Sequence, residues 1–222
     1  MNFAGILAGG KGTRMGKTDL PKQFLVSPVI EAIVVAVPEN WVGYTQDIVE
    51  KYCPDEKIHI IAGGAERNDT IMNICHYIQE HFQATKEDIV VTHDAVRPFV
   101  TQRIIMDNCE LCQKFDATDT VIPATDTIVE AKDGQTISNI PVRKQMYQGQ
   151  TPQSFKVQEF MDIYNSLTEE EKGILTDAAK VYVLKGKKVG LVMGESYNMK
   201  VTTKYDLKLA NLMLNNLDDK KE

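Results

Sequence analysis

The chain has 222 residues, of which 43% are hydrophobic and 25% are charged, and its formal net charge is −6 at pH 7. This length and composition predict one globular domain with a substantial core. The acidic balance argues against a nucleic-acid surface, which would carry a basic patch. No apolar run approaches the ~18 residues of a membrane span, and the N-terminus enters a predicted strand without a signal-peptide pattern. We therefore expect a cytoplasmic protein that binds neither nucleic acid nor membranes.

The first expected element is a strand at residues 3–8, and a glycine-rich loop follows it. A buried strand that feeds such a loop leaves backbone N–H groups free to surround an anion, and the phosphates of a nucleotide are the expected ligand. The alternative is a flexible turn with solvated charges. The candidate nucleotide-binding residues of this segment are Leu7, Ala8, Gly9, Gly10, Lys11, Gly12 and Thr13.

Two known phosphate-loop templates fit this loop incompletely. A Walker A loop would need Ser or Thr at Gly12 to hold Mg²⁺. The dinucleotide fingerprint finds its first two glycines at Gly10 and Gly12 but meets Met15 at the third position, so only those two glycines support an oxidoreductase that binds a nucleotide cofactor. Neither template explains the basic side chains, which suit several phosphate oxygens at once. These are Lys11, Arg14 and Lys22.

Further along the chain, apolar runs typical of strands alternate with helical patterns. This alternation predicts a mostly parallel sheet with helices on both faces. Ligands of such sheets bind beyond the carboxyl ends of the strands, where the glycine-rich loop lies. The other expected strands are residues 33–37, 58–61, 89–92, 120–122 and 189–193, and the apolar helical stripes are Ile71, Ile74, Cys75, Ile78 and Phe82 and then Leu207, Ala210, Leu214 and Leu217.

A polar segment, residues 63–70 (GGAERNDT), follows the third expected strand. Its two glycines allow close approach to a flat ring, and the first N–H groups of the following helix, with Thr70, can bind polar edges. A helix cap by Asn68 or Asp69 would need no ligand. Both interpretations are compatible with each other.

The fourth expected strand ends in residues 92–98 (THDAVRP). A carboxylate at this strand end, that of Asp94, suits Mg²⁺, which takes one or two carboxylates together with substrate phosphates. The alternative is an ion pair between Asp94 and Arg97 that fixes the turn. The phosphate loop beside it favours the metal interpretation.

Two motifs are assigned structural roles. Cys109 and Cys112 form a C-x-x-C, but they lie within a helical pattern, so we expect buried thiols and no zinc or redox site. Thr203 and Asp206 fit a capping box at the start of the last helix, which is favoured over a metal role for Asp206.

Residues 128–155 differ from the rest of the chain. Residues 128–131 and 137–140 are short strand-like runs around Asp133-Gly134, a strong hairpin turn signal. A hairpin that leaves an α/β body is unstable alone and is expected to pack on a partner or on its own subunit. We expect 128–155 to be a dimerisation arm of a single domain, 1–222.

The first loop, with Pro21-Lys22 after it, resembles the signature of nucleotidyltransferases that join a nucleoside monophosphate to a sugar or polyol phosphate. Later segments resemble the bacterial cytidylyltransferases that act on methylerythritol phosphate or ribitol 5-phosphate, and residues 93–99 and 147–153 are more similar to the ribitol phosphate branch. The similarity runs from the N-terminus to Leu217. The segments that carry it are Asp126-Thr127-Ile128, Arg143, Thr151-Pro152-Gln153, Thr176-Asp177-Ala178 and residues 194–202.

The resemblance implies a Rossmann-like, mostly parallel sheet of the nucleotide-diphospho-sugar transferase type, with a protruding β-arm and a homodimer. It implies transfer of CMP from CTP to D-ribitol 5-phosphate, giving CDP-ribitol and pyrophosphate for teichoic acid synthesis, with Mg²⁺ or another divalent cation. The methylerythritol phosphate reaction is the sister alternative.

The resemblance also implies roles for individual residues. Arg14, Lys22 and Lys200 neutralise the triphosphate and the transition state, and Ala8, Gly9, Gly64, Ala65 and Thr70 surround the cytidine. Arg67 and Asp94 lie near the ribose and the metal, with Asp94 as the metal ligand. The acceptor meets Asp94, Arg97, Thr127, Thr151 and Arg143, the last of these sent into the neighbouring subunit's site.

The chain departs from the family between Leu25 and Val26, where a crossover helix is expected and no helical stripe occurs in residues 17–30. If that segment exists in the molecule but is left out of this sequence, the Cα atoms of Leu25 and Val26 will lie farther apart than the ~3.8 Å of a trans peptide. A continuous peptide would favour a non-catalytic CTP-binding protein.

Overall fold

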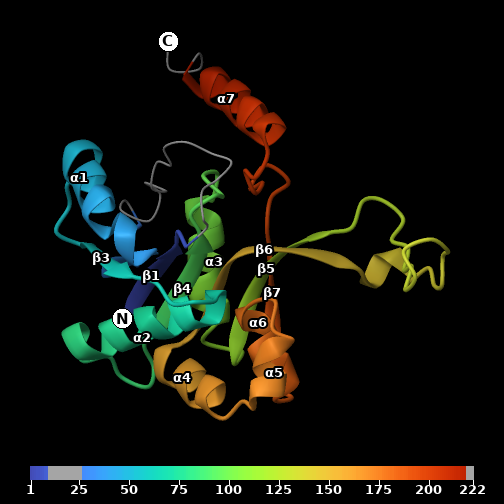
Figure 1. Ribbon diagram of the computed structural model, residues 1–222, viewed down its shortest axis with the longest axis horizontal. Helices are drawn as coiled ribbons and strands as arrows, with labels where there is room; N and C mark the ends of the chain where they lie inside the picture. Colours follow the sequence, from blue (N-terminus) through green and yellow to red (C-terminus); the bar gives the residue numbers. More distant parts are fainter. Residues whose placement is uncertain (10–26, 219–222) are drawn as a thin grey trace.

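The structure, a computed structural model, describes residues 1–9 and 27–218 of the chain (Figure 1). The basic loop that is expected to bind the triphosphate lies outside the described residues, and so does the Leu25–Val26 junction. The expected site residues concerned are Gly10, Lys11, Gly12, Thr13, Arg14 and Lys22.

The described strands form one seven-stranded sheet in the order β3-β2-β1-β4-β6-β5-β7. Neighbouring strands are parallel, except that β6 runs antiparallel to β4 and β5. The mostly parallel sheet predicted from the sequence is therefore confirmed. The strands are β1 (Asn2–Leu7), β2 (Ala32–Val37), β3 (Ile58–Ala62), β4 (Ile89–Asp94), β5 (Ala117–Pro123), β6 (Tyr147–Lys156) and β7 (Val189–Met193).

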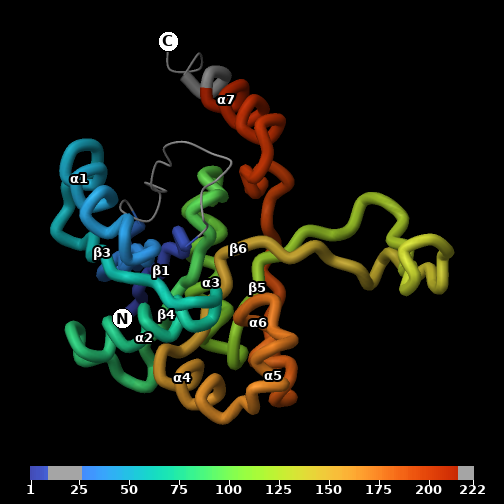
Figure 2. The backbone as a smooth tube through the Cα atoms, viewed as in Figure 1, coloured from blue at the N-terminus to red at the C-terminus, as the bar shows by residue number. Residues whose placement is uncertain are grey.

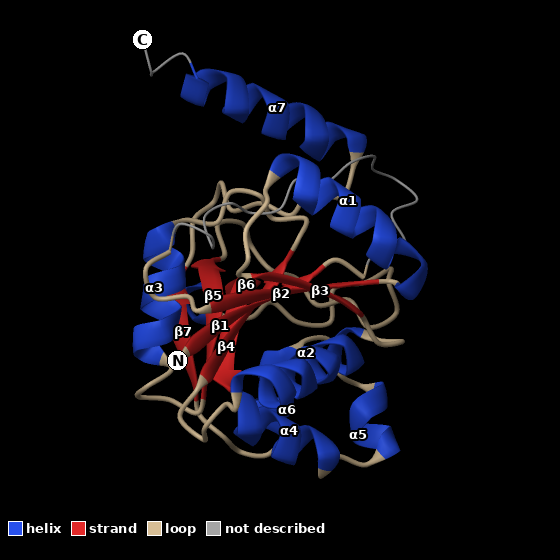
Figure 3. Cartoon of the chain, turned by 90° about the vertical axis from the view of Figure 1, so that its left-hand side faces the viewer, coloured by secondary structure: helices blue, strands red, loops and turns tan. Residues whose placement is uncertain are grey.

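Helices cover both faces of the sheet, as expected, because the central strands are apolar on both sides. Figure 3 shows α2, α4 and α6 on one face and α1 and α3 on the other. Their apolar residues form two core clusters, one on each face of the sheet. The helices are η1 (Glu39–Trp41), α1 (Val42–Tyr52), α2 (Arg67–Phe82), α3 (Gln102–Leu111), η2 (Arg143–Gln145), α4 (Val157–Asn165), α5 (Glu169–Gly173), α6 (Ala178–Leu184) and α7 (Lys204–Asp218).

The carboxyl ends of β1 and β4 meet at one edge of the sheet. Leu7, the last residue of β1, is in register with Asp94, the last residue of β4. The chain then continues through Ala8, whose N–H donates to the carbonyl of Ala36 in β2 (2.9 Å). The expected nucleotide loop and the expected metal ligand therefore start from adjacent points of the sheet.

The sequence pattern does not predict β6, which lies between β4 and β5. Its sequence, YQGQTPQSFK, is polar and contains Pro152, a residue that argues against a central strand. Residues 150–155 are nevertheless buried, because neighbouring side chains satisfy their polar groups. Residues 147–155 of the expected arm thus belong to the sheet, and the expected arm range of 128–155 extends too far.

The segment between β5 and β6 leaves the body of the protein, as the smooth backbone of Figure 2 shows clearly. A hairpin turn occurs where expected: Glu130 and Asn139 form an antiparallel bridge, and Gly134 has a φ of +69°, which favours glycine. The two strand-like runs give this isolated bridge and not the regular strands that were expected.

Two further structural expectations are confirmed. Thr203 and Asp206 form the capping box of α7: the N–H of Asp206 donates to Thr203 Oγ1 (3.1 Å) and the N–H of Thr203 donates to Asp206 Oδ2 (2.8 Å). Cys109 and Cys112 are buried free thiols, and burial raises the pKa of each to about 12. No helix among the described residues is long and apolar enough to cross a membrane.

Candidate active site

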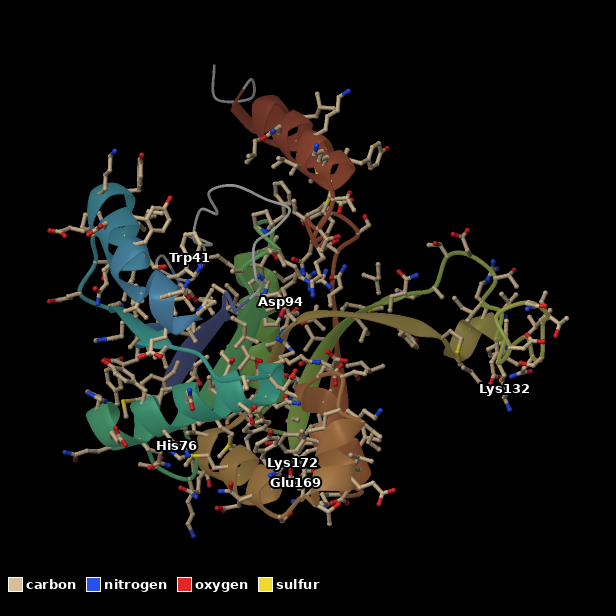
Figure 4. The ribbon with its side chains drawn as sticks, in the orientation of Figure 1. Trp41, His76, Asp94, Lys132, Glu169 and Lys172 are labelled. Atoms are coloured by element: carbon tan, nitrogen blue, oxygen red, sulfur yellow. The ribbon has the colours of Figure 1, made fainter. Side chains whose placement is uncertain are left out.

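The candidate site is centred on the Asp94 carboxylate, at the carboxyl end of β4 (Figure 4). Arg67, from the first turn of α2, approaches Asp94 Oδ1 with Nη1 at 2.8 Å. Lys200, from the segment between β7 and α7, approaches Oδ2 with Nζ at 2.9 Å. Burial raises the pKa of Asp94, but the two cations outweigh burial and hold that pKa below its usual value. The structure therefore brings together three of the expected site residues from distant parts of the chain.

Arg97 does not pair with Asp94 as the alternative interpretation of the turn required. Its Nη1 donates to the carbonyl oxygen of Asn198 at 2.8 Å, and its backbone N–H donates to the carbonyl of Asp94 at 3.0 Å. Arg97 thus ties the turn after β4 to the segment that carries Lys200. The ion pairs of Asp94 are instead with Arg67 and Lys200.

Thr151 lies beside Asp94 within a buried hydrogen-bond chain. The backbone N–H of Asp94 donates to Thr151 Oγ1 (3.1 Å), and this hydroxyl lies 2.9 Å from His93 Nδ1. His93 Nε2 lies 2.9 Å from the carbonyl oxygen of Arg97, which can only accept, so the ring proton is on Nε2 and Nδ1 accepts from Thr151. Burial lowers the pKa of His93 to about 4, so the ring is neutral near pH 7.

The glycine turn before α2 is pressed against the helix start. The N–H of Gly64 donates to Thr70 Oγ1 at 3.0 Å, and a Cβ on Gly64 would overlap the side chain of Asp69 and lie 2.8 Å from the backbone nitrogen of Thr70. The helix starts with a capping box in which Glu66 is the N-cap and Asp69, at N3, accepts from the Glu66 N–H at 3.1 Å. Asp69 therefore takes part in the cap, as expected, although neither Asn68 nor Asp69 is the N-cap residue. Ala65 is exposed beside this turn.

The end of β1 presents the first residues of the expected nucleotide loop. Leu7 and Ala8 are half-buried and Gly9 is exposed. A Cβ built on Gly9 would meet nothing within 4 Å of the described chain. These residues lie at the same edge of the sheet as Asp94.

Thr127 and Arg143 are the two expected acceptor-binding residues that the structure does not bring to Asp94. Both are exposed and lie on the protruding segment, where Arg143 Nη1 donates to the carbonyl of Thr125 at 3.1 Å. Figure 4 shows this separation: Asp94 lies near the centre of the molecule and Lys132 marks the protruding segment.

Two polar residues that the sequence does not identify, Gln153 and Asp119, lie next to Arg67 of the site. Gln153, on β6, donates from Nε2 to Asp119 Oδ1 on β5 (2.9 Å), and its Oε1 accepts from Arg67 Nη2 (3.5 Å) and from the N–H of Ala178 (3.3 Å). Burial raises the pKa of Asp119 to about 6. The sequence does carry one indication of this role: Asp119 lies within the short strand ATDTVIP, and charged side chains are rarely buried in strands unless they have a partner.

The described residues contain no group of three or more His, Cys, Asp or Glu side chains that could hold a metal ion. Asp94 offers a single carboxylate, at the end of β4. Each Asp94 oxygen accepts one charged hydrogen bond and keeps a second lone pair. One carboxylate with substrate phosphates is a ligand set that Mg²⁺ takes, so the site fits a cation that binds together with a triphosphate.

Comparison with known proteins places the chain in a family. The model of the 2-C-methyl-D-erythritol 4-phosphate cytidylyltransferase (IspD) family matches residues 3–216. The ribitol-5-phosphate cytidylyltransferase of Lactiplantibacillus plantarum is 49% identical over 96% of this chain and 98% of its own, and that of Streptococcus pneumoniae serotype 2 is 53% identical over 96% and 99%.

Two crystal structures show the same fold. The 4-diphosphocytidyl-2C-methyl-D-erythritol synthase of Anaerococcus prevotii has a TM-score of 0.81 at 24% identity and covers 96% of both chains. The Francisella tularensis 2-C-methyl-D-erythritol 4-phosphate cytidylyltransferase has a TM-score of 0.74 at 24% identity, covering 95% of this chain and 98% of its own. With the family match over residues 3–216, the chain belongs to the 2-C-methyl-D-erythritol 4-phosphate cytidylyltransferase (IspD) family.

Proposed function

We propose that this chain transfers CMP from CTP to D-ribitol 5-phosphate, forming CDP-ribitol and pyrophosphate. One observation carries the chemistry: Arg67 and Lys200, from distant segments, meet at Asp94 beside the start of the expected triphosphate loop. The acceptor follows from the two relatives at 49% and 53% identity, which are both named ribitol-5-phosphate cytidylyltransferase. Teichoic acid synthesis is the expected use of the product.

The proposed reaction is an in-line displacement at phosphorus. A phosphate oxygen of ribitol 5-phosphate attacks the α-phosphorus of CTP, a new P–O bond forms, and the bond to the β-phosphate breaks, with its electrons leaving on pyrophosphate. No covalent enzyme intermediate is needed, so catalysis consists of positioning and of electrostatic stabilisation. Because the chain's net charge of −6 repels a triphosphate at long range, local cations must capture it.

Individual residues have separate tasks in this proposal. Lys200 neutralises negative charge that develops in the transition state, and Arg14 and Lys22 of the first loop do the same for the triphosphate. Ala8, Gly9 and the Gly64 turn surround the cytidine, with Ala65 and Thr70. Thr151 contacts the acceptor. Its hydroxyl donates its one hydrogen bond to His93 Nδ1, so toward a ligand Thr151 can only accept a hydrogen bond, for example from a hydroxyl group.

A divalent cation, Mg²⁺ in the first instance, is proposed to bind at Asp94 with the triphosphate. When bound, it would neutralise charge on the phosphate oxygens that react. Excess EDTA should therefore abolish pyrophosphate release, and added Mg²⁺ should restore it. Full turnover in EDTA would exclude this part of the proposal.

The acceptor is tested by a pyrophosphate-release assay with CTP and a panel of polyol phosphates. Ribitol 5-phosphate should support turnover, and 2-C-methyl-D-erythritol 4-phosphate should support much less. The reverse order would make the chain a 2-C-methyl-D-erythritol 4-phosphate cytidylyltransferase, the activity in the family's name.

A non-catalytic CTP-binding protein is the second candidate, and one observation favours it. The alignments with the two relatives extend over 230 and 232 residues, whereas this chain has 222, so part of the relatives' length has no counterpart here. Such a protein would bind CTP in a calorimeter and release no pyrophosphate with any acceptor. An oxidoreductase would instead bind NAD(P)H with enhanced fluorescence.

A further inference from the structure

Asp119 is a half-buried acidic residue to which the proposed reaction gives no role. In the sheet, Gln153 of β6 lies between Thr92 of β4 and Asp119 of β5. Thr92 is two residues before Asp94 on the same strand. The neighbouring residues on β5, Thr118 and Thr120, form hydrogen bonds with Asn108 of α3, so their side chains lie on the face of the sheet that α3 covers. Asp119 therefore lies on the face that carries Arg67.

The contacts of Gln153 fix the orientation of its amide. On one side, Nε2 donates to Asp119 Oδ1 at 2.9 Å. On the other side, Oε1 faces two donors, Arg67 Nη2 at 3.5 Å and the N–H of Ala178 at 3.3 Å. Only this orientation satisfies all three groups, since a flipped amide would present its NH₂ to two other donors. Arg67 in turn donates from Nη1 to Asp94 at 2.8 Å.

A carboxylate at position 119 enforces that orientation better than a neutral group does. An ionised carboxylate can only accept hydrogen bonds, so it must face the Gln153 NH₂. A protonated Asp119, or an asparagine there, can also donate to Gln153 Oε1 and so stabilises the flipped amide. The flipped amide would repel the Arg67 guanidinium and loosen its contact with Asp94.

The ionised Asp119 carboxylate destabilises the folded protein, which indicates that it has a functional role. Burial raises the pKa of Asp119 to about 6, and the carboxylate of Asp177, at the start of α6, contributes to the same rise. The Gln153 hydrogen bond and the charges of Arg67 on α2 and Arg97 after β4 lower that pKa in part. The backbone beside the second oxygen is Gly149, where a Cβ would lie 3.8 Å from Asp119 Oδ2.

We propose that Asp119 is a positioning residue of the nucleotidyl transfer, whose carboxylate orients the Gln153 amide and through it holds Arg67 against Asp94. This inference rests on the proposed function, because the relay ends in the Asp94 cluster. Asp119 does not touch the substrates in this assignment. It acts through two intermediate side chains.

The test compares Asp119→Asn with the double variant Asp119→Asn/Gln153→Glu. At about pH 8 the single variant should lose about tenfold or more in kcat/KM, since a small displacement of a positioning group has effects of that size. The double variant should recover most of this loss, because the introduced asparagine donates to the introduced glutamate, which still accepts from Arg67 and Ala178. Asp47→Asn, an exposed change on α1, is the matched control and should be unaffected.

The pH dependence of the ratio of wild-type to Asp119→Asn kcat/KM separates this role from a structural one. Substrate phosphates titrate near pH 6 as well, but their contribution cancels in the ratio. The ratio should fall toward one as pH drops below about 6, where wild-type Asp119 becomes protonated. Thermal unfolding should show that the single variant is at least as stable as wild type. A pH-independent ratio, wild-type activity of Asp119→Asn, or no recovery in the double variant would overturn the proposal.

A direct structural readout keeps this inference separate from the proposed function. If the wild-type protein releases no pyrophosphate with any acceptor, the proposed function fails. The side-chain amide resonances of Gln153 should still shift with a midpoint near pH 6 in wild type and lose that titration in Asp119→Asn. Amide resonances that do not titrate in wild type would refute the Asp119 relay whatever the activity.

Discussion

Lys200 holds an ammonium that is about half exposed yet lies 2.9 Å from the Asp94 carboxylate. Because its charge should bind the transition state more strongly than the ground state, Lys200→Ala should lower kcat by more than it raises KM, with a loss in kcat of about 100-fold. Lys22→Ala should behave in the same way. Steady-state kinetics with Lys86→Ala, an exposed lysine, as the control would check this. Activity within a factor of two of wild type in both site variants would remove these roles.

Asp119 makes a prediction about stability that is independent of activity. Its pKa is raised from 3.8 to about 6 in the folded protein, so the folded state binds more protons than the unfolded state between these values, and stability falls as pH rises through that window. Asp119→Asn removes this effect and should raise the free energy of unfolding above about pH 6 by at most about 3 kcal/mol. The gain should vanish near pH 4. Urea unfolding of wild type and Asp119→Asn at about pH 4 and above about pH 6 measures this gain. If the two proteins are equally stable at both pH values, the raised pKa of Asp119 is contradicted.

Part of the site could be predicted from residue identities and part could not. Arg67, Asp94 and Lys200 carry charges at strand ends or in motif segments, and the structure brings them within hydrogen-bond distance. Asp119 and Gln153 lie in the middle of strands, where the sequence alone does not show that two polar side chains share one sheet face. That depends on the pairing of β5 with β6, a long-range contact.

At the scale of elements, Gly64 controls how closely the third βα turn packs on α2. A Cβ at Gly64 would overlap Asp69 and lie 2.8 Å from the backbone nitrogen of Thr70, so Gly64→Ala must displace the turn or the helix start. We expect a loss of about 1–3 kcal/mol in stability and a raised KM for CTP. Gly43→Ala, where a Cβ meets nothing within 4 Å, is the control and should cost nothing. A wild-type KM for CTP in Gly64→Ala would show that this turn does not bind the nucleotide.

The elements that the sequence predicts well are those whose burial is apolar. The all-buried strand β2, AIVVAV, and the stripe of α2 appear within a residue or two of their expected positions. The apolar pattern does not predict β6, because the burial of this strand depends on hydrogen bonds made by three polar side chains. These are Gln150, Thr151 and Gln153. For α2 the sequence indicates the capping role of Asp69 but not the N-cap residue, because Glu66 caps the helix through a reciprocal pair with Asp69.

At the scale of the whole molecule, the segment between β5 and β6 is an exposed apolar extension. Ile137, Ile140 and Val142 are 61%, 57% and 61% exposed, and they lie on a protrusion that the body of the same chain does not cover (Figure 1). Exposed apolar side chains gathered in this way are typical of an interface. A second copy of the chain is the proposed partner, and it would receive Arg143 in its active site.

A mixing experiment tests this exchange. Arg143→Ala and Lys22→Ala proteins should each be nearly inactive, because each lacks one cation in every site. If Arg143 acts in the partner's site, a mixed dimer contains one site with both wild-type residues and one with neither. Equal mixing should then regenerate about a quarter of wild-type activity when subunits exchange at random, since half of the dimers are mixed and each has one intact site of two. Subunit exchange is verified independently by fluorescence energy transfer between labelled subunits. If the exchanged mixture stays as inactive as its parents, Arg143 acts within its own chain or has no part in catalysis.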